Sequence, residues 1–245
     1  FTSLYDIDFD RVNNRIIIVD SGAHKLRAVN LATGIITTIA GTGISGFSGD
    51  GGPATSAKLA SPQRASADHL GNVYISDLLN NRIRKIDTSG NISTYAGTGT
   101  VGFSGDGGPA TSANLNYPYG IRADGAGNVF FADRGNSRIR KINSSGTITT
   151  VAGTGASGYT GDGGPATSAQ IREPEAMGMN GSGSIVFVHN SGSSNYDDRI
   201  RQIEGVATPF PTNQAPTAPT ILFTSNDTAQ IGQTNPDGIT DTTPT

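Results

Sequence analysis

The sequence predicts an all-β fold, a β-propeller built from four repeat units of about 56 residues. Three observations lead to this prediction. The motif Gly-Asp-Gly-Gly-Pro-Ala-Thr-Ser-Ala begins at Gly49 and recurs at Gly105 and Gly161, which gives a period of 56 residues. Gly accounts for 34 of the 245 residues, about twice the usual share, as in chains with many turns. Each unit consists of short β-branched segments separated by turn residues, and none of these segments suits a long helix.

The third repeat shows how one unit is expected to fold. Strands are predicted over residues 120–124, 128–133, 138–143 and 147–152, with turns of Gly, Asn and Ser between them. Four antiparallel strands per repeat are typical of a propeller blade, whereas a solenoid coil supplies only one or two. The fourth repeat has no clear last strand, because Gly205–Phe210 is short and runs into proline. We therefore expect four propeller units over residues 1–210, the last of them incomplete.

Each repeat places a polar residue before one hairpin and a basic residue five positions later. We expect an ion pair at the mouth of each hairpin, where it would hold the two strands together. The expected pairs are Asp20 with Lys25, Asp77 with Arg82, and Asp133 with Arg138. In the fourth repeat His189 takes the place of the Asp, and the following loop is five residues longer.

A loop of about 20 residues, 41–62 in the first copy, connects successive units and is long for a connection between blades. Its segment 53–59 is expected to form one helical turn that begins at proline. Each copy has one aromatic residue and one carboxylate, which are Phe47 and Asp50, Phe103 and Asp106, and Tyr159 and Asp162. One interpretation is structural: the aromatic ring fills the groove beside the blade, and the Asp caps the Gly-Gly-Pro turn. The other is that the loops form a ring of ligand-binding residues on one face, for calcium or a glycan.

The third repeat also resembles a known repeat family. The segments Pro118-Tyr119-Gly120-Ile121, Gly127-Asn128-Val129-Phe130-Phe131-Ala132-Asp133 and Asn136-Ser137-Arg138-Ile139-Arg140-Lys141-Ile142 resemble the NHL repeat, and residues 62–86 match it less closely. The resemblance covers roughly residues 5–205. It implies a β-propeller, commonly with six blades, whereas this sequence contains four units. The ring is therefore expected to be incomplete here or to be completed by another chain.

The composition changes after residue 210. Residues 211–219 read as an extended Pro/Thr-rich linker. Residues 220–245 resemble the start of an immunoglobulin-like module of large bacterial surface proteins, and also suit an extended strand tail. We expect strands of this tail to add to a sheet edge of another copy, which would give a homo-oligomer or a filament.

Several function classes are disfavoured by the sequence. The pattern Gly-x-Gly-x-x-Gly at 41–46 leads into more Gly and Pro instead of a helix, so we expect no dinucleotide and no other cofactor. Asp6, Asp8 and Asp10 resemble a calcium loop, but Arg11 and Ile17 stand where it needs Gly and Glu, so no metal is expected. The formal charge of −3 and the carboxylates near each basic strand argue against nucleic acid. The apolar runs are far too short for membrane insertion.

The sequence therefore predicts a non-catalytic structural or interaction module of an extracellular or cell-surface protein, with other protein subunits as partners. Two alternatives remain open. One is a propeller lyase or hydrolase whose site lies outside this segment. The other is a glycan-binding module that uses the Gly-rich loops.

Overall fold

The computed structural model describes residues 1–189 and 199–210. The chain divides into two units, Phe1–Ala215 and Pro216–Thr245. The predicted linker at 211–219 and the predicted module at 220–245 both lie outside the described residues. The propeller predicted over 1–210 falls within the first unit.

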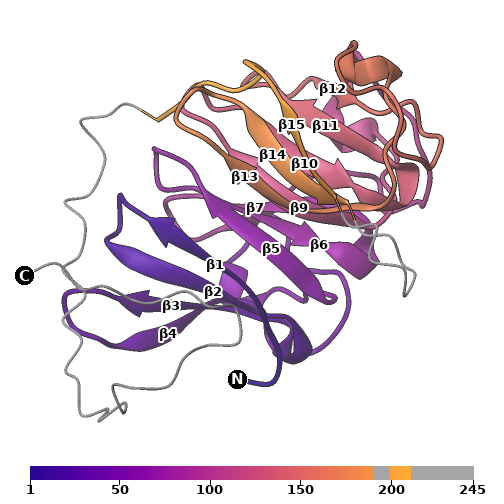
Figure 1. Cartoon of the computed structure of the whole chain (residues 1–245). Coiled ribbons are helices and arrows are strands. Elements are labelled where there is room, and N and C mark those ends of the chain that lie inside the picture. Colours follow the sequence, from indigo (N-terminus) through magenta and orange to yellow (C-terminus); the bar gives the residue numbers. More distant parts are fainter. Residues whose placement is uncertain (190–198, 211–245) are drawn as a thin grey trace, which may run out of the picture. The chain divides into compact units, whose positions relative to one another are not determined.

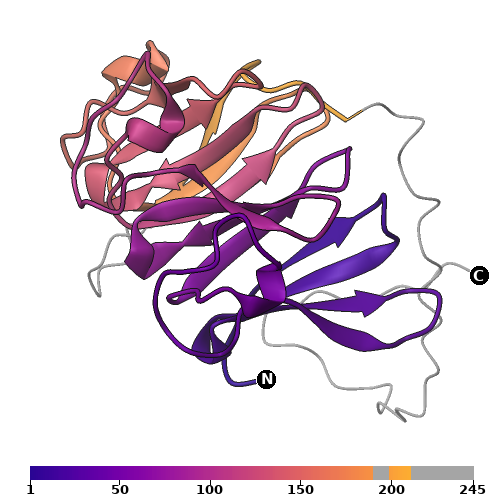
Figure 2. The ribbon, with the colours of Figure 1, turned by 180° about the vertical axis from the view of Figure 1, so that it is seen from behind.

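The first unit is built from four antiparallel sheets that follow one another in sequence order (Figure 1, Figure 2). Each sheet is a meander in which consecutive strands are hydrogen-bonded neighbours. The first three sheets have four strands, and the fourth has three among the described residues. The strands are β1 (Leu4–Asp10), β2 (Arg15–Asp20), β3 (Lys25–Asn30), β4 (Ile36–Ala40), β5 (Pro62–Ala67), β6 (Val73–Asp77), β7 (Arg82–Ile86), β8 (Ile92–Ala96), β9 (Pro118–Ala123), β10 (Val129–Asp133), β11 (Arg138–Ile142), β12 (Ile148–Ala152), β13 (Pro174–Met179), β14 (Ile185–His189) and β15 (Arg199–Ile203).

The first strands of the blades, β1, β5, β9 and β13, lie side by side around the centre, each in contact with the next. The core consists of three apolar layers, one between each pair of neighbouring blades. Between the first two blades, for example, Ile17, Val19 and Leu26 pack against Val73 and Ile75, and all five are fully buried. Burial of such side chains is the main favourable term in folding, so each blade is stabilised by its neighbours.

Short polar residues hold the turn that joins the first two strands of a blade. Asp124 is fully buried, and its carboxylate accepts hydrogen bonds from the backbone N–H groups of Ala126 and Asn128 and from the side chain of Asn128. Asp68 makes the equivalent bonds in the second blade. The turns therefore provide partners for backbone groups that would otherwise be unpaired.

The predicted fold class is confirmed, and the boundaries differ by one or two residues. β9 begins at Pro118 instead of residue 120, because the first position of a strand tolerates a proline that has no N–H to donate. The predicted helical turns are 3-10 helices of three residues each, at Ala54–Ser56, Ala110–Ser112 and Ala166–Ser168. Among the residues that the structure describes, the fourth sheet ends at β15, in agreement with the expectation that Gly205–Phe210 supplies no outer strand.

Candidate functional site

Each long loop is bound to the blade that follows it by an Asp–Arg ion pair and an aromatic–arginine contact, and we call these contacts together the clamp. Asp50, in the loop between the first two blades, forms an ion pair with Arg84 of β7 at 2.6 Å. Its other carboxylate oxygen accepts a hydrogen bond of 2.7 Å from the hydroxyl of Thr94 on β8. The Asp therefore does not cap the Gly-Gly-Pro turn, and that part of the structural interpretation is wrong. The carboxylate is drawn to Arg84 because this guanidinium is fully buried and has little access to water.

The aromatic residue of the loop packs on arginines of the same strand. The ring of Phe47 lies 3.8 Å from the guanidinium carbon of Arg82 and 4.8 Å from that of Arg84. Phe47 remains 42% exposed, so it covers the arginines without filling a closed groove. Phe103 repeats this arrangement over Arg138 and Arg140, at 3.7 and 5.0 Å. Stacked cation–π contacts of this kind favour Arg over Lys.

The predicted ion pair between Asp77 and Arg82 is wrong in its basic partner. The two residues are opposite each other in the strand register, but the carboxylate of Asp77 pairs with Arg84 at 3.4 Å. It also accepts hydrogen bonds of 2.7 Å from the backbone N–H of Ala60 and from the side chain of Asn80. Arg82 is less buried and donates instead to the carbonyl oxygens of Asn80 and Thr98. The fully buried Arg84 thus takes both carboxylates.

The third blade requires the same correction. Asp133 pairs with Arg140 at 3.3 Å instead of with Arg138, and Arg140 pairs in turn with Asp106 at 2.7 Å. Burial raises the pKa of Asp133 to about 6, although the side chain of Asn136, the backbone N–H of Asn116 and Arg140 all favour the ionised form.

In the first blade, Asp20 forms no ion pair with Lys25 among the described residues. Its carboxylate accepts hydrogen bonds from the backbone N–H groups of Thr2 and Ser3, at 3.0 and 3.1 Å. Burial alone would raise the pKa of Asp20, but these N–H donors outweigh it and lower the pKa below the usual range. Asp20 therefore holds the start of β1.

The clamp on the fourth blade is altered at one position. Asp162 pairs with Arg201 at 2.6 Å, and Tyr159 lies 4.8 Å from the guanidinium of Arg199. His189 holds the position that Asp77 and Asp133 hold in the second and third blades. Its Nδ1 accepts a hydrogen bond of 3.2 Å from the backbone N–H of Arg172. Burial and the charge of Arg201 lower the pKa of His189 to about 4, so the imidazole is neutral at pH 7.

The glycines of the loop have a structural role. The backbone of Gly51 and Gly52 exchanges hydrogen bonds of 2.8 and 2.9 Å with Ile92, which extends the outer edge of the second blade. Gly97, the first Gly of one Gly-x-Gly pattern, has φ +94°, and a Cβ there would lie 2.4 Å from the carbonyl oxygen of Asn81. The pattern therefore reflects close backbone packing and edge protection.

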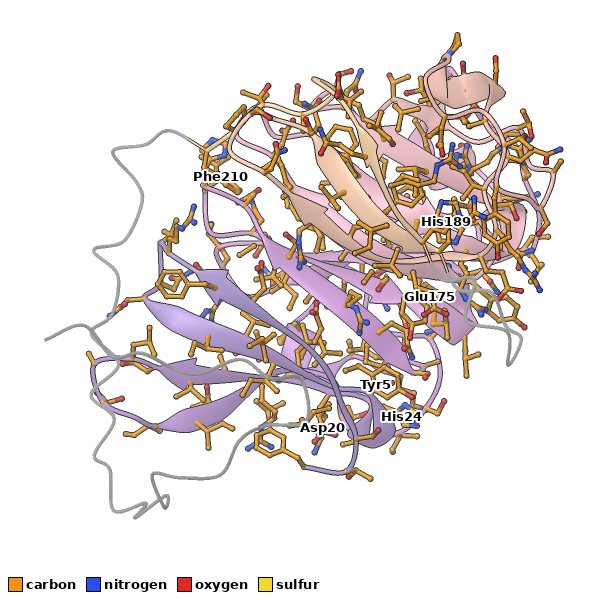
Figure 3. All side chains as sticks on the ribbon, viewed as in Figure 1. Tyr5, Asp20, His24, Glu175, His189 and Phe210 are labelled. Atoms are coloured by element: carbon orange, nitrogen blue, oxygen red, sulfur yellow. The ribbon has the colours of Figure 1, made fainter. Side chains whose placement is uncertain are left out.

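A second cluster lies where the first strands of the four blades begin. We call it the channel mouth: it contains Tyr5, Arg64, Tyr119, Arg134, Glu173 and Glu175. Arg64 donates to the backbone oxygen of Tyr5, and its guanidinium lies 5.1 Å from the ring of Tyr119. Arg134 pairs with Glu173 at 2.5 Å and with Glu175 at 3.1 Å. Residues of all four blades therefore meet here, and Figure 3 shows Tyr5 and Glu175 toward the same end.

The backbone at the channel mouth is strained in a regular way. Ser61, Tyr117 and Glu173, each just before a first strand, have φ values of +51°, +49° and +38°. Non-glycine residues rarely adopt this left-handed conformation, and its recurrence at the same position of three repeats assigns it to the turn that leads into each first strand. Tyr117 is also 42% exposed.

A cavity of about 200 Å³ lies at the opposite ends of the first strands and is lined by residues of all four sheets and by Phe210. Figure 3 shows Phe210 far from the channel mouth, and its ring lies 5.3 Å from the guanidinium of Arg11. Asp8 of β1 lines this cavity and accepts a hydrogen bond of 2.8 Å from the backbone N–H of Ala67. Burial raises the pKa of Asp8, against the opposing charge of Arg122.

Among residues 1–189 and 199–210, no group of three or more His, Cys, Asp or Glu is placed to hold a metal ion. No helix in the same part of the chain is long and apolar enough to cross a membrane.

The channel mouth was not predicted from the sequence, because its residues differ from one repeat to the next. The clamp residues recur from blade to blade, whereas one mouth position is Tyr5, Gln63, Tyr119 and Glu175 in the four blades. A position that varies between nearly identical repeats is not required by the blade. That variation was the available signal for a site.

Sequence comparisons identify relatives of part of the chain. The Teneurin NHL domain family matches residues 101–160. Protein SUPPRESSOR OF QUENCHING 1, chloroplastic, from Arabidopsis thaliana is 32% identical over 132 residues, which cover 51% of this chain and 12% of that protein. Teneurin-1 from Gallus gallus is 37% identical over 94 residues, which cover 33% of this chain and 3% of that protein. The chain thus spans a small fraction of these relatives.

Three solved structures share the fold at low identity. A protein of unknown function from Bacteroides thetaiotaomicron has a TM-score of 0.59 and 22% identity, covering 75% of this chain and 44% of its own. A gluconolactonase from Xanthomonas campestris has a TM-score of 0.56 and 10% identity, covering 83% and 58%. A chain of a nidogen/laminin complex has a TM-score of 0.51 and 19% identity, covering 84% and 66%. The four meander sheets and these likenesses show that the fold is a β-propeller, and the family match over residues 101–160 supports blades of the NHL type.

Proposed function

We propose that the chain is a non-catalytic interaction module that binds a protein partner at the channel mouth. One observation carries this proposal: the mouth gathers aromatic, Arg and Glu side chains that the repeat does not require. Tyr5 remains 45% exposed there. Tyr and Arg are the residue types enriched at the energetic centre of protein interfaces.

The mixed charge of the mouth favours a polypeptide with both acidic and basic side chains. Arg64 and Arg134 flank Tyr119, while Glu173 and Glu175 provide acceptors beside them. The glycan alternative assigned the binding to Phe47, Phe103 and Tyr159 of the loops. All three rings pack against arginines of their own chain, as Tyr119 does at the mouth, and Phe47 and Phe103 remain 42% and 41% exposed.

An extracellular or cell-surface location belongs to the same proposal. It is supported by the Pro/Thr-rich composition of residues 211–219 and by the resemblance of residues 220–245 to an immunoglobulin-like module. The proposed assembly with other copies through this tail is tested by deleting residues 212–245 and measuring mass in solution. A truncated chain that assembles like the original would exclude it.

The binding proposal is tested by selecting peptides from a displayed library against the chain and measuring their affinity for variants. Tyr119→Ala should weaken the selected peptides about tenfold or more, as loss of an aromatic anchor does at an interface. Leu70→Ala removes a side chain that is 59% exposed on a turn between first and second strands, and should leave the affinity unchanged. Equal affinities for the chain and Tyr119→Ala would place the binding surface elsewhere.

The enzyme alternative placed its site outside this segment, but Asp8 in the cavity at the opposite ends of the first strands offers a candidate site within it. A carboxylate whose pKa is raised by burial is a candidate general base. Lactones and esters should be assayed with and without Ca²⁺, Mg²⁺ and Zn²⁺. Turnover that disappears in Asp8→Asn would contradict the non-catalytic proposal.

A further inference from the structure

The cavity lined by all four sheets lies beside a first-strand position that changes its chemistry from blade to blade. Four residues hold this position, two before the residue that caps the turn after each first strand: Asp8, Ser66, Arg122 and Gly178. The carboxylate of Asp8 accepts a hydrogen bond of 2.8 Å from the backbone N–H of Ala67 in the next blade. The hydroxyl of Ser66 likewise accepts one of 3.1 Å from the N–H of Ala123. At the first two blade interfaces, this position therefore supplies an acceptor for a backbone donor.

The third interface has no such acceptor. Arg122 can only donate, and its guanidinium bonds to the carbonyl oxygen of Ile121 on its own strand at 3.0 Å. It forms no ion pair with any of the described residues. Met179 of β13 holds the strand position of Ala67 and Ala123, and in the part of the chain that the structure describes no side chain accepts from its N–H. A guanidinium and a backbone N–H therefore both lack an anionic acceptor here.

The space beside these two donors is open and has an apolar wall. A Cβ added at Gly178 would meet no atom within 4 Å. Arg122 and Met179 line the cavity of about 200 Å³ together with the rings of Phe9 and Phe210. A cavity of about 150 Å³ admits benzene, so one of this size accommodates a ligand of roughly eight non-hydrogen atoms.

Two further lining residues are compatible with an anion in the cavity. The Nδ1 of His69 is buried and has no hydrogen-bond partner among the described residues, so a neutral imidazole has a donor to offer there. Asp8 also lines the cavity, but its carboxylate is already bonded to the N–H of Ala67. Burial raises the pKa of Asp8, which favours its neutral form and reduces its repulsion of an anion.

We propose that this cavity binds a small carboxylic acid with a branched apolar body. The carboxylate accepts hydrogen bonds from Arg122 and from the N–H of Met179, so that the ligand supplies the acceptor that side chains supply at the other two interfaces. The apolar body packs against Phe9 and Phe210. Figure 3 shows Phe210 far from Tyr5 and Glu175, so this site is separate from the partner surface proposed at the channel mouth.

The test is isothermal titration calorimetry of the full chain with 4-methylpentanoate, a branched acid of the required size. The matched probe is 3-methylbutylamine, which has the same branched body and an ammonium group in place of the carboxylate. The acid should bind, and the amine should give no binding heat. In the unsubstituted chain, the amide proton signal of Met179 should also move downfield when the acid is added, because its N–H gains an acceptor.

Arg122→Met should weaken 4-methylpentanoate about tenfold or more, since a hydrogen bond to a charged group is lost. Arg122→Lys should restore part of the affinity, because it keeps the charge. The control is Arg172→Met, which removes an arginine that does not line the cavity and should leave the affinity unchanged. Phe210→Ala should weaken the acid severalfold and leave the preference for acid over amine intact.

Four results would overturn the proposal. These are no binding of the acid, equal binding of acid and amine, an unshifted amide signal of Met179, and equal affinities for the original chain and Arg122→Met.

Discussion

Removing the guanidinium of Arg140 should destabilise the protein far more than removing that of Arg138, two residues earlier on the same strand. Arg140 is fully buried between Asp133 at 3.3 Å and Asp106 at 2.7 Å, and it also donates to the carbonyl of Ser104 at 2.8 Å. Arg140→Met would leave Asp133 buried without its counter-charge. Loss of one partner from a buried ion pair costs about 3–5 kcal/mol. The loss of the pair with Asp106 adds little to this cost, because Asp106 is partly exposed and water solvates its carboxylate once the arginine is gone.

Arg138→Met is the matched control, since it removes the same group from a more exposed site. Arg138 donates to two carbonyl oxygens and packs on Phe103, and its loss should cost about 1 kcal/mol. Urea unfolding followed by circular dichroism and tyrosine fluorescence suits a chain without Trp. For a domain of this size, the Arg140 variant should also lose roughly 6–20 °C in Tm. Equal losses in the two variants would refute the assignment of Arg140 as the arginine of the clamp.

Three further predictions concern single positions. The pKa of Asp133 is raised to about 6 in the fold, so the folded state binds a proton more readily than the unfolded state. The free energy of unfolding should therefore fall as pH rises from about 4 to 6. Asp133→Asn should flatten this slope when stability is measured by urea titration at each pH. His189 has the opposite effect on the pH dependence of stability, because its pKa is lowered to about 4. The stability that this group contributes is present above the ordinary pKa of about 6.5 and is lost as pH falls from there toward about 4. His189→Gln should therefore reduce the sensitivity of the protein to acid, and an unchanged pH profile would contradict a buried neutral imidazole. Gly97→Ala should cost more than about 1 kcal/mol, since Cβ would collide with the carbonyl oxygen of Asn81 at φ +94°, whereas Gly90→Ala, also at positive φ but with open space around it, should cost less.

The blades were predictable from the sequence because strands and tight turns depend on residues close together in the chain. β10 and β11 were predicted to within one residue from short strand-like segments and the turn residues between them. The 56-residue period then placed the same elements in every repeat. The incomplete fourth blade also followed from local composition, because proline after Gly205–Phe210 disfavours a paired outer strand.

The choice of partners across the fold was decided only by the tertiary structure. Arg82 and Arg84 both project from one strand near Asp77, and sequence spacing favoured Arg82 because it lies directly across the hairpin. The structure selects Arg84, because the loop carrying Asp50 arrives from the preceding blade and leaves Arg84 with no access to water. Burial by a segment 34 residues away, and not the local pattern, determines which arginine needs a counter-charge. The channel mouth has the same origin, since Tyr5, Arg64, Tyr119 and Glu175 become neighbours only when four blades meet.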